Sequence, residues 1–420
     1  MATLGGIIAG KAIALGLVLL ACWVAGGESR GPIFGAIRAV RHGLVGTGAT
    51  VFDVTNYGAK ADGKTDNALA FIKAWNAACH SNGPAKLVIP TGTFLSGPVV
   101  FQGPCEGSNP ITIEVQGNII ASTDISEYSE DGWFWFEMID GLVLKGGIFD
   151  GQGQTAWQYN DCKHNSGCQH LPVSLKFNKV KNTIVDGVTS LNSKGFHFSL
   201  TFSQNFTGVN LNISAPGNSP NTDGIRLSSS DRINISSSFI ATGDDCIGII
   251  QGATNVTITQ ITCGPGHGIS IGSLGKYPEE KDVIGVHVRN ATLTNTTNGV
   301  RIKTYPGARQ LHASDIIFED IVLNNVKNPI IIDQNYGSHK VIKPSSVKVS
   351  DVHFKNIRGT TISDLAVLLS CSSSNPCDQV ELSDINLSYA GTPLRNKNMT
   401  SSCMNTKPTF SGTQNPPACQ

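Results

Sequence analysis

Three short motifs of one form follow one another in the middle of the chain: Asp223-Gly-Ile-Arg-Leu, Asp245-Cys-Ile-Gly-Ile and His267-Gly-Ile-Ser-Ile. They begin at residues 223, 245 and 267, a constant step of 22 residues, and a shorter run of alternating apolar residues precedes each of them. A strand-only repeat of this length corresponds to one coil of three short strands and three turns. A single coil cannot bury its inner face, so neighbouring coils must stack into one continuous core. The repeat therefore predicts a β-solenoid in which most of the chain is one domain.

The same form recurs on both sides of these motifs. It is present as Lys194-Gly-Phe-His-Phe and Asn298-Gly-Val-Arg-Ile, and further apolar runs begin at Ile316 and Val347. The outer steps are about 30 residues long, which indicates loops inserted between coils. A β-sandwich and a β-propeller are the alternatives, but a propeller blade needs four strands in roughly 40 residues, a longer unit than the one seen here.

One amphipathic helix is predicted before the repeats. Residues 51–54 form a short apolar strand, and a polar turn follows at residues 62–67. Asp66 or Asn67 can cap the free amides of a helix that starts there. Leu69, Ile72 and Trp75 follow at helical spacing, and Cys79 continues the pattern, so we expect these four residues on the buried face.

Composition limits the classes of function. The chain has 420 residues, of which 40 % are hydrophobic and only 15 % charged, and its 31 basic residues balance 31 acidic ones. This balance removes the bulk electrostatic argument for a nucleic-acid partner. A local basic cleft for an anionic polymer remains compatible with it.

The N-terminal residues resemble an export signal. An apolar stretch covers residues 12–24, after Lys11 and before the small residues Ala25, Gly26 and Gly27. We expect residues 1–27 to be a cleaved signal peptide, with an uncleaved anchor as the alternative. Residues 28–50 form an irregular leader, residues 51–403 the catalytic domain, and residues 404–420 a C-terminal tail held by a disulfide.

Cleavage would leave an even number of cysteines, which in an exported chain predicts a disulfide framework. Close spacing suggests the pairs Cys162–Cys168, Cys246–Cys263, Cys371–Cys377 and Cys403–Cys419, which leaves Cys79–Cys105. Other pairings stay open on the sequence alone. A metal site is the rival interpretation, but no CxxC pair or histidine ladder supports it, so we expect no metal and no cofactor.

Eight N-x-S/T sequons also favour export, because such triplets accept glycans on solvated turns. The asparagines are Asn205, Asn212, Asn234, Asn255, Asn290, Asn295, Asn386 and Asn398.

Stacked coils bring polar residues from separate repeats onto one wall. Equivalent positions on successive coils lie roughly 4.8 Å apart, so Asp223, Asp245, His267 and Asn298 should form one column, with Asp244 beside it. Three carboxylates are thereby forced together, and at least one of their pKa values should be raised. An acid and a base in one cleft are what hydrolysis of a glycosidic bond requires.

A second column three positions further along supplies positive charge. It should contain His197, Arg226, Gly248, Ser270 and Arg301. Lys303 follows two residues after Arg301, so both side chains point to the same side of a strand while Ile302 points inward. Two cations beside the carboxylates would suit a substrate that itself carries carboxylates.

Each motif by itself has an ordinary structural interpretation. Asp-Asp pairs often cap turns, Gly-His-Gly is commonly a turn, and Arg-Ile-Lys is commonly an exposed strand. Tyr336, which follows the next strand, could be a packing residue. Their alignment on consecutive coils is what favours a functional site.

Four motifs in this order resemble the polygalacturonases, glycoside hydrolase family 28: Asn221-Thr-Asp223, Asp244-Asp245, Gly266-His-Gly268 and Arg301-Ile-Lys303. The resemblance runs from about residue 51 to residue 403, and the sequence from Cys263 to Gly275 is similar to that of plant members of the family. It implies a right-handed parallel β-helix and hydrolysis of α-1,4-linked galacturonan with inversion.

The resemblance also implies roles for single residues. Asp244 corresponds to the general acid, Asp223 and Asp245 to the pair that activates water, and His267 to a residue that tunes the acid. Arg301 and Lys303 correspond to substrate-binding cations, while Asn221 and Tyr336 match other positions of the cleft. We expect an acidic pH optimum, because the acid must stay protonated.

Two further stretches, Thr304-Tyr-Pro-Gly307 and Phe149 to Trp157, resemble pollen-type exopolygalacturonases. Exo action needs a loop that closes one end of the cleft, and residues 157–171 are the segment expected to do so. Endo cleavage, a Ca²⁺-dependent lyase and a non-catalytic wall-binding β-helix are the alternatives. The resemblance implies a secreted monomer that acts in the cell wall on an anionic polysaccharide, without stable membrane association after signal cleavage.

Overall fold

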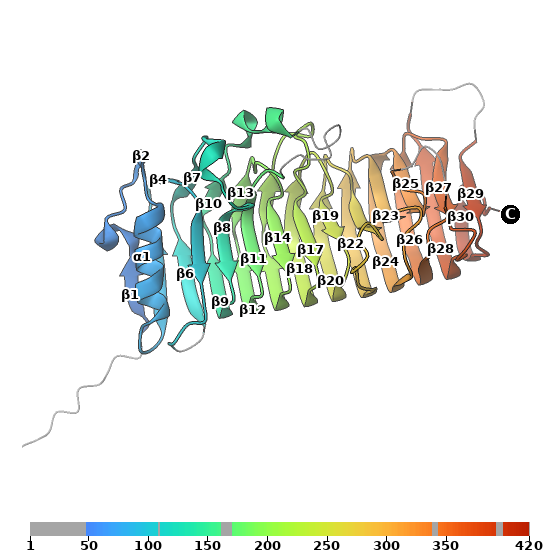
Figure 1. Cartoon of the computed structure of the whole chain (residues 1–420). Coiled ribbons are helices and arrows are strands. Elements are labelled where there is room, and N and C mark those ends of the chain that lie inside the picture. Colours follow the sequence, from blue (N-terminus) through green and yellow to red (C-terminus); the bar gives the residue numbers. More distant parts are fainter. Residues whose placement is uncertain (1–47, 108–109, 161–169, 338–342, 392–397, 420) are drawn as a thin grey trace, which may run out of the picture. The chain divides into compact units, whose positions relative to one another are not determined.

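The structure is a computed structural model that describes residues 48–107, 110–160, 170–337, 343–391 and 398–419. Within these residues the chain folds into coils of parallel strands that stack in sequence order, from the blue to the red end in Figure 1. Every strand pair is parallel, and each coil pairs with the coils before and after it. The predicted parallel β-helix is confirmed. The described residues between 48 and 419 form one compact unit.

The described strands make two sheets, and the smaller one has eleven strands. Its strands are β5 (Val99–Gln102), β8 (Gly132–Glu137), β11 (Val173–Asn178), β14 (Phe198–Thr201), β17 (Ile225–Ser228), β19 (Ile247–Ile249), β21 (Ile269–Leu274), β23 (Asn298–Thr304), β25 (Asn328–Asp333), β27 (Leu365–Ser370) and β29 (Thr400–Met404).

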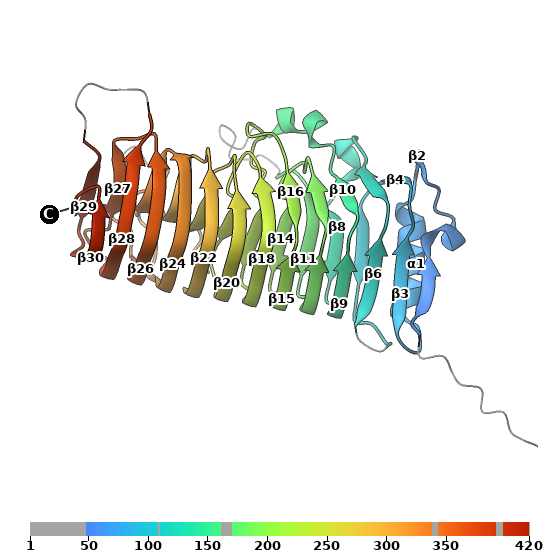
Figure 2. The same ribbon diagram turned by 180° about the vertical axis from the view of Figure 1, so that it is seen from behind.

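The larger sheet has nineteen described strands and bends around the remaining walls of the coils (Figure 2). Its strands are β1 (Thr50–Asp53), β2 (Asp62–Asp66), β3 (Ala85–Ile89), β4 (Thr93–Ser96), β6 (Ile111–Val115), β7 (Asn118–Ala121), β9 (Asp140–Lys145), β10 (Ile148–Asp150), β12 (Lys181–Asp186), β13 (Thr189–Leu191), β15 (Gln204–Val209), β16 (Asn212–Ser214), β18 (Asp231–Ala241), β20 (Thr254–Cys263), β22 (Val283–Thr294), β24 (Leu311–Val326), β26 (Val347–Thr361), β28 (Asp378–Tyr389) and β30 (Thr409–Asn415).

Stacked apolar side chains form the core. Ile225, Ile247, Ile269, Val300 and Ile330 occupy one row of paired strands, and none of them is exposed to solvent. Burying one such side chain contributes about 1.5–3 kcal/mol. Because identical rows repeat along the helix, the register of neighbouring coils is well specified: a slip by one residue would turn the apolar row outward.

The long strands turn corners at residues with positive φ. Asn205, Arg232, Asn255, Asp315 and Asp351 form one such column, each with φ between 52° and 55°. Asparagine and aspartate tolerate this left-handed conformation better than most residues. The repeated polar residues at these positions are therefore corner residues of the coil.

Helix α1 (Ala68–Cys79) covers the first coil, as predicted. An oxygen of Asp66 accepts a hydrogen bond from the amide of Ala68 at 3.0 Å, and Trp75 stacks on Phe101. The expectation for Leu69 was wrong, since it is 63 % exposed; small alanines and Phe71 take the buried face beside Trp75 because the helix lies close to the strands. Four single turns of 3₁₀ helix complete the described helices: η1 (Val54–Tyr57), η2 (Ile125–Glu127), η3 (Gly153–Thr155) and η4 (Trp157–Tyr159).

Four expected disulfides form, namely Cys79–Cys105, Cys246–Cys263, Cys371–Cys377 and Cys403–Cys419. Cys162 and Cys168 lie outside the described residues. The C-terminal segment contributes β30, which pairs in parallel with β28. None of the described helices is long and apolar enough to cross a membrane.

Candidate active site

The acidic column lies where turns enter the smaller sheet. Ile225, Ile247 and Ile269 pair in register, so Asp223, Asp245 and His267, each two residues earlier, follow one another on consecutive coils. This part of the sequence prediction is confirmed, and it places residues from three repeats at one end of the same sheet.

The second column is confirmed except at its first member. Arg226, Gly248, Ser270 and Arg301 pair in register as expected. The residue that pairs with Arg226 on the preceding coil is Ser199, so His197 was placed two residues out of register.

The motif alignment is the cause: Phe198 pairs with Ile225, so the residue level with Asp223 is Phe196 and not Lys194. His197 points into the core, where its Nδ1 lies 2.9 Å from the Ser190 hydroxyl. Burial lowers the pKa of His197 to about 3. It is a neutral core residue that does not reach the carboxylates.

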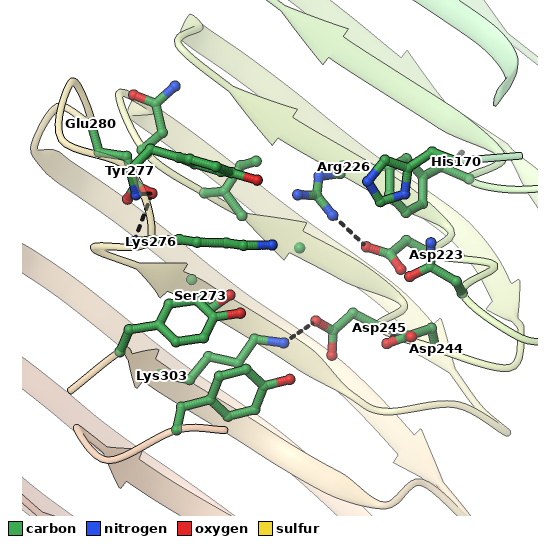
Figure 3. A pocket seen from close by; sticks show the side chains of 18 residues that line it. His170, Asp223, Arg226, Asp244, Asp245, Ser273, Lys276, Tyr277, Glu280 and Lys303 are labelled. Carbon is green, nitrogen blue, oxygen red and sulfur yellow. Dashed lines mark hydrogen bonds and ion pairs between the residues drawn. The ribbon is translucent and has the colours of Figure 1, made fainter. Parts of the chain in front are cut away.

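Parts of both columns line a pocket with a volume of about 330 Å³ (Figure 3), whereas His267, Ser270 and Arg301 are not among its lining residues. Asp223, Asp244, Asp245 and Lys303 line it, and the predicted cleft residues Asn221 and Tyr336 do so as well. The volume is at the lower end of the range for small-ligand pockets. The structure thus brings together residues from positions 170 to 336 of the chain.

Asp244 and His267 form a hydrogen-bonded pair at the edge of this pocket. One oxygen of Asp244 lies 2.8 Å from Nδ1 of His267 and also accepts the backbone amide of Asp245 at 2.8 Å. Burial by itself would raise the pKa of Asp244, but the hydrogen bond and charge of His267 outweigh it and lower the pKa. The same hydrogen bond raises the pKa of His267.

Asp223 is the carboxyl group with the raised pKa. Burial is the largest cause, the negative charge of Asp244 adds to it, and the pKa rises to about 8. Arg226 offsets part of the rise from 3.7 Å away. The expectation that crowding raises at least one pKa of the three carboxyl groups is confirmed, and burial contributes more than repulsion.

Asp245 holds both predicted cations. Its two oxygens accept from Arg301 at 2.8 Å and from Lys303 at 2.7 Å, and the Ser270 hydroxyl donates a third hydrogen bond. The Asp245 side chain is only 4 % exposed. The ring of Tyr336 lies 5.1 Å from the Lys303 ammonium, which adds a cation–π contact. The charges of Arg301 and Lys303 are therefore already compensated by Asp245 before substrate binds.

Asp244, Asp245 and His267 offer donor atoms within 4.8 Å of one another, the one group among the described residues with the spacing of a metal site. Their contacts are already internal, since Asp244 bonds to His267 and Asp245 to two cations. This arrangement favours proton transfer over cation binding.

The sequence predicted loops inserted between the outer coils, but not that one of them borders the pocket. Lys276, Tyr277 and Glu280 line it from the segment between β21 and β22. The step from His267 to Asn298 is longer than the 22 residues of the preceding coils, and this difference indicated the inserted loop without indicating what it borders.

Comparison with known proteins agrees with this geometry. The sequence profile of Glycosyl hydrolases family 28 matches residues 79–413. The chain belongs to this family. It is 45 % identical to an exopolygalacturonase of Arabidopsis thaliana over 419 residues, which cover 98 % of this chain and 96 % of the relative.

An exopolygalacturonase of Platanus acerifolia is 47 % identical over 378 residues, 89 % of this chain and 98 % of the relative. Among solved structures, endo-xylogalacturonan hydrolase from Aspergillus tubingensis superimposes with a TM-score of 0.72 at 25 % identity, covering 86 % of this chain and all of that one. The sequence-based assignment to a glycoside hydrolase of family 28 is confirmed.

Proposed function

We propose that this chain is an exopolygalacturonase that hydrolyses α-1,4-galacturonosyl linkages of polygalacturonate from a chain end. The observation that carries the proposal is the convergence of Asp223, Asp244, Asp245 and Lys303 in one pocket, with Arg301 bonded to Asp245. Such a site combines an acid, a base and positive charge for a uronate polymer. The names of the relatives from Arabidopsis and Platanus support the same substrate and the exo mode.

Catalysis needs one proton on the three carboxyl groups. In the free site this proton resides on Asp223, whose pKa is about 8. Asp244 is the proposed general acid and lies beside Asp223, close enough for their charges to interact. A bound polyanion displaces water and adds negative charge next to Asp244, and both effects raise its pKa. Acid catalysis by Asp244 therefore requires this proton to move from Asp223 to Asp244 in the substrate complex, which leaves Asp223 and Asp245 to activate water.

Inversion is the proposed stereochemical outcome, on the strength of the resemblance. Inverting glycosidases usually separate their carboxyl groups by roughly 6.5–9.5 Å, whereas donor atoms of Asp244 and Asp245 lie within 4.8 Å. Asp223, on the neighbouring coil, is the other partner for the acid. Proton NMR of the first product measures its anomeric configuration. Inversion of an α-linkage releases the β-anomer first.

Exo cleavage requires a wall at one end of the cleft. The flank of the segment at residues 157–171 is attached to the site region, since Trp157 donates to the carbonyl of Ser193 at 3.0 Å and Asn160 to that of Pro220 at 3.2 Å. His170, at its other end, lines the pocket. Residues 161–169 of the segment lie outside the described residues, and the support for a wall on this side comes from these flanking contacts.

Product analysis tests the proposal. Wild-type enzyme should release monomeric galacturonate from de-esterified polygalacturonate from the first minutes. A ladder of oligomers would instead indicate endo action, an unsaturated product would indicate a lyase, and binding without cleavage would indicate a non-catalytic wall protein.

We also propose that the chain is secreted as a monomer into the cell wall after removal of residues 1–27. The four described disulfides favour an oxidising compartment. All eight sequon asparagines are exposed. N-terminal sequencing of the mature protein and a mass shift on enzymatic deglycosylation test this proposal; size-exclusion chromatography tests the monomer.

A further inference from the structure

The positive charge of Arg301 and Lys303 is largely compensated before any substrate arrives. Both side chains bond to Asp245, and both are nearly buried. A substrate carboxylate that approaches them also approaches the negative charge of Asp245. A uronate polymer carries one carboxylate per sugar. Tight binding therefore needs further cations whose charge no protein carboxylate compensates.

Arg226 is one such cation. It lines the pocket on the side of Asp223, and its side chain is 36 % exposed. Its distance of 3.7 Å from Asp223 is too long for a good hydrogen bond. In the free site the raised pKa keeps Asp223 protonated at neutral pH, so the charge of Arg226 is available to an incoming carboxylate. The guanidinium stacks on Phe196 at 4.6 Å, which orients it without neutralising it.

Lys276 is the other cation. Its side chain reaches from the opposite side of the pocket, and Figure 3 shows its ammonium pointing into the space between Arg226 and Lys303. Among the described residues it makes no ion pair; its nearest aromatic contact is the ring of Tyr277 at 5.3 Å.

The loop that carries Lys276 is held in place by its own hydrogen bonds. The Glu280 carboxylate accepts the backbone amides of Gly275 at 2.6 Å and of Lys276 and Tyr277 at 2.9 Å each. Gln251 accepts the amide of Lys281 at 3.1 Å. The Glu280 carboxylate is therefore hydrogen-bonded to the loop backbone. These bonds hold the loop so that Lys276 faces the pocket in a defined position.

The floor between the two cations has no side chain. A Cβ added to Gly248 would lie 3.5 Å from an oxygen of Asp223 and 3.9 Å from one of Asp245. The hydrogen of glycine leaves room there for a group of the substrate, directly beside the carboxyl groups proposed to act on it.

We propose that Arg226 and Lys276 form a second carboxylate-binding subsite, which holds the carboxylate of a galacturonosyl unit next to the scissile bond. The proposal rests on the proposed function and extends it: Arg301 and Lys303 already bond to Asp245, and Arg226 and Lys276 add further positive charge that recognises the anionic group of the sugar. Arginine offers a planar pair of donors to a carboxylate, and lysine adds a point charge from the other side.

Kinetics with trigalacturonate test the subsite. Lys276→Met should raise KM about tenfold, as expected for the loss of one charge-assisted hydrogen bond, and should change kcat far less. Lys276→Arg should recover most of the affinity, and Arg226→Gln should raise KM in the same way. Lys281→Met is the matched control, because Lys281 is exposed on the same loop but does not line the pocket.

A methyl-esterified trigalacturonate lacks the carboxylate charge. Comparing it with the acid therefore distinguishes loss of charge recognition from a change in loop shape. Wild type and Lys276→Met should bind the neutral ester equally well. Equal weakening for acid and ester, or equal kinetics of Lys276→Met and Lys281→Met on the acid, would overturn the subsite. Calorimetric titration of trigalacturonate into the Asp244→Asn variant, with and without Lys276→Met, keeps this test independent of turnover. A protein that binds through Lys276 but cleaves nothing would refute the proposed hydrolase and retain the subsite.

Discussion

Replacing Asp245 by asparagine should destabilise the fold far more than the same replacement at Asp244. Asp245 is 4 % exposed and compensates two cations, Arg301 and Lys303, whose side chains are 12 % and 7 % exposed. Asparagine keeps one acceptor oxygen but turns an amide donor toward a cation. Removing one partner from a buried ion pair costs about 3–5 kcal/mol, because the remaining charges stay desolvated without compensation.

Asp244 provides the matched comparison. Its side chain is 26 % exposed, and its hydrogen-bond partners are a backbone amide and His267, which is 40 % exposed. Solvent can replace these contacts, so Asp244→Asn should cost about 1 kcal/mol. Both variants should be inactive, and therefore stability, not activity, distinguishes the two environments.

Thermal unfolding followed by circular dichroism measures the difference. At about 2 °C per kcal/mol for a chain of this size, Asp245→Asn should lower Tm by about 6–10 °C, and Asp244→Asn by about 2 °C. Adding Lys303→Met to Asp245→Asn should recover part of the loss, because it removes one uncompensated charge. Equal Tm values for the two single variants would refute the argument that Asp245 is the structural partner of both cations.

Three further predictions concern activity and stability. Asp244→Asn should lower kcat on polygalacturonate by about 10²–10⁴-fold while leaving affinity for trigalacturonate nearly unchanged, as measured by calorimetry; near-normal turnover would show that Asp244 is not the acid. The site needs one proton among its carboxyl groups, and that proton leaves as the pH rises through the Asp223 pKa of about 8. The kcat/KM value should therefore fall above that pH. A rate that still climbs at about pH 9 contradicts this. Replacing Cys246 and Cys263 together by serine should lower the unfolding free energy by about 2–5 kcal/mol in urea titrations, and an unchanged midpoint would show that the bond adds no stability.

Much of the fold could be predicted because a β-helix turns sequence spacing into spatial spacing. Residues 22 positions apart, such as Asp223 and Asp245, must lie on adjacent coils once their strands pair in parallel. The apolar row through Ile225 and Ile247 fixes that register by burial. The same logic failed at His197, because β14 pairs with β17 two residues away from the register that the motif alignment implied.

What the sequence by itself determined was the stack of coils and the wall on which Asp223, Asp245, His267 and Arg301 meet, because their order is periodic and parallel pairing preserves periodic order. The tertiary structure alone decided which charges compensate each other and which loop borders the pocket. Asp245 takes both cations, and Lys276 arrives on an inserted segment. Neither outcome is periodic: the first depends on side-chain reach and burial, and the second on a loop path that strand pairing does not constrain.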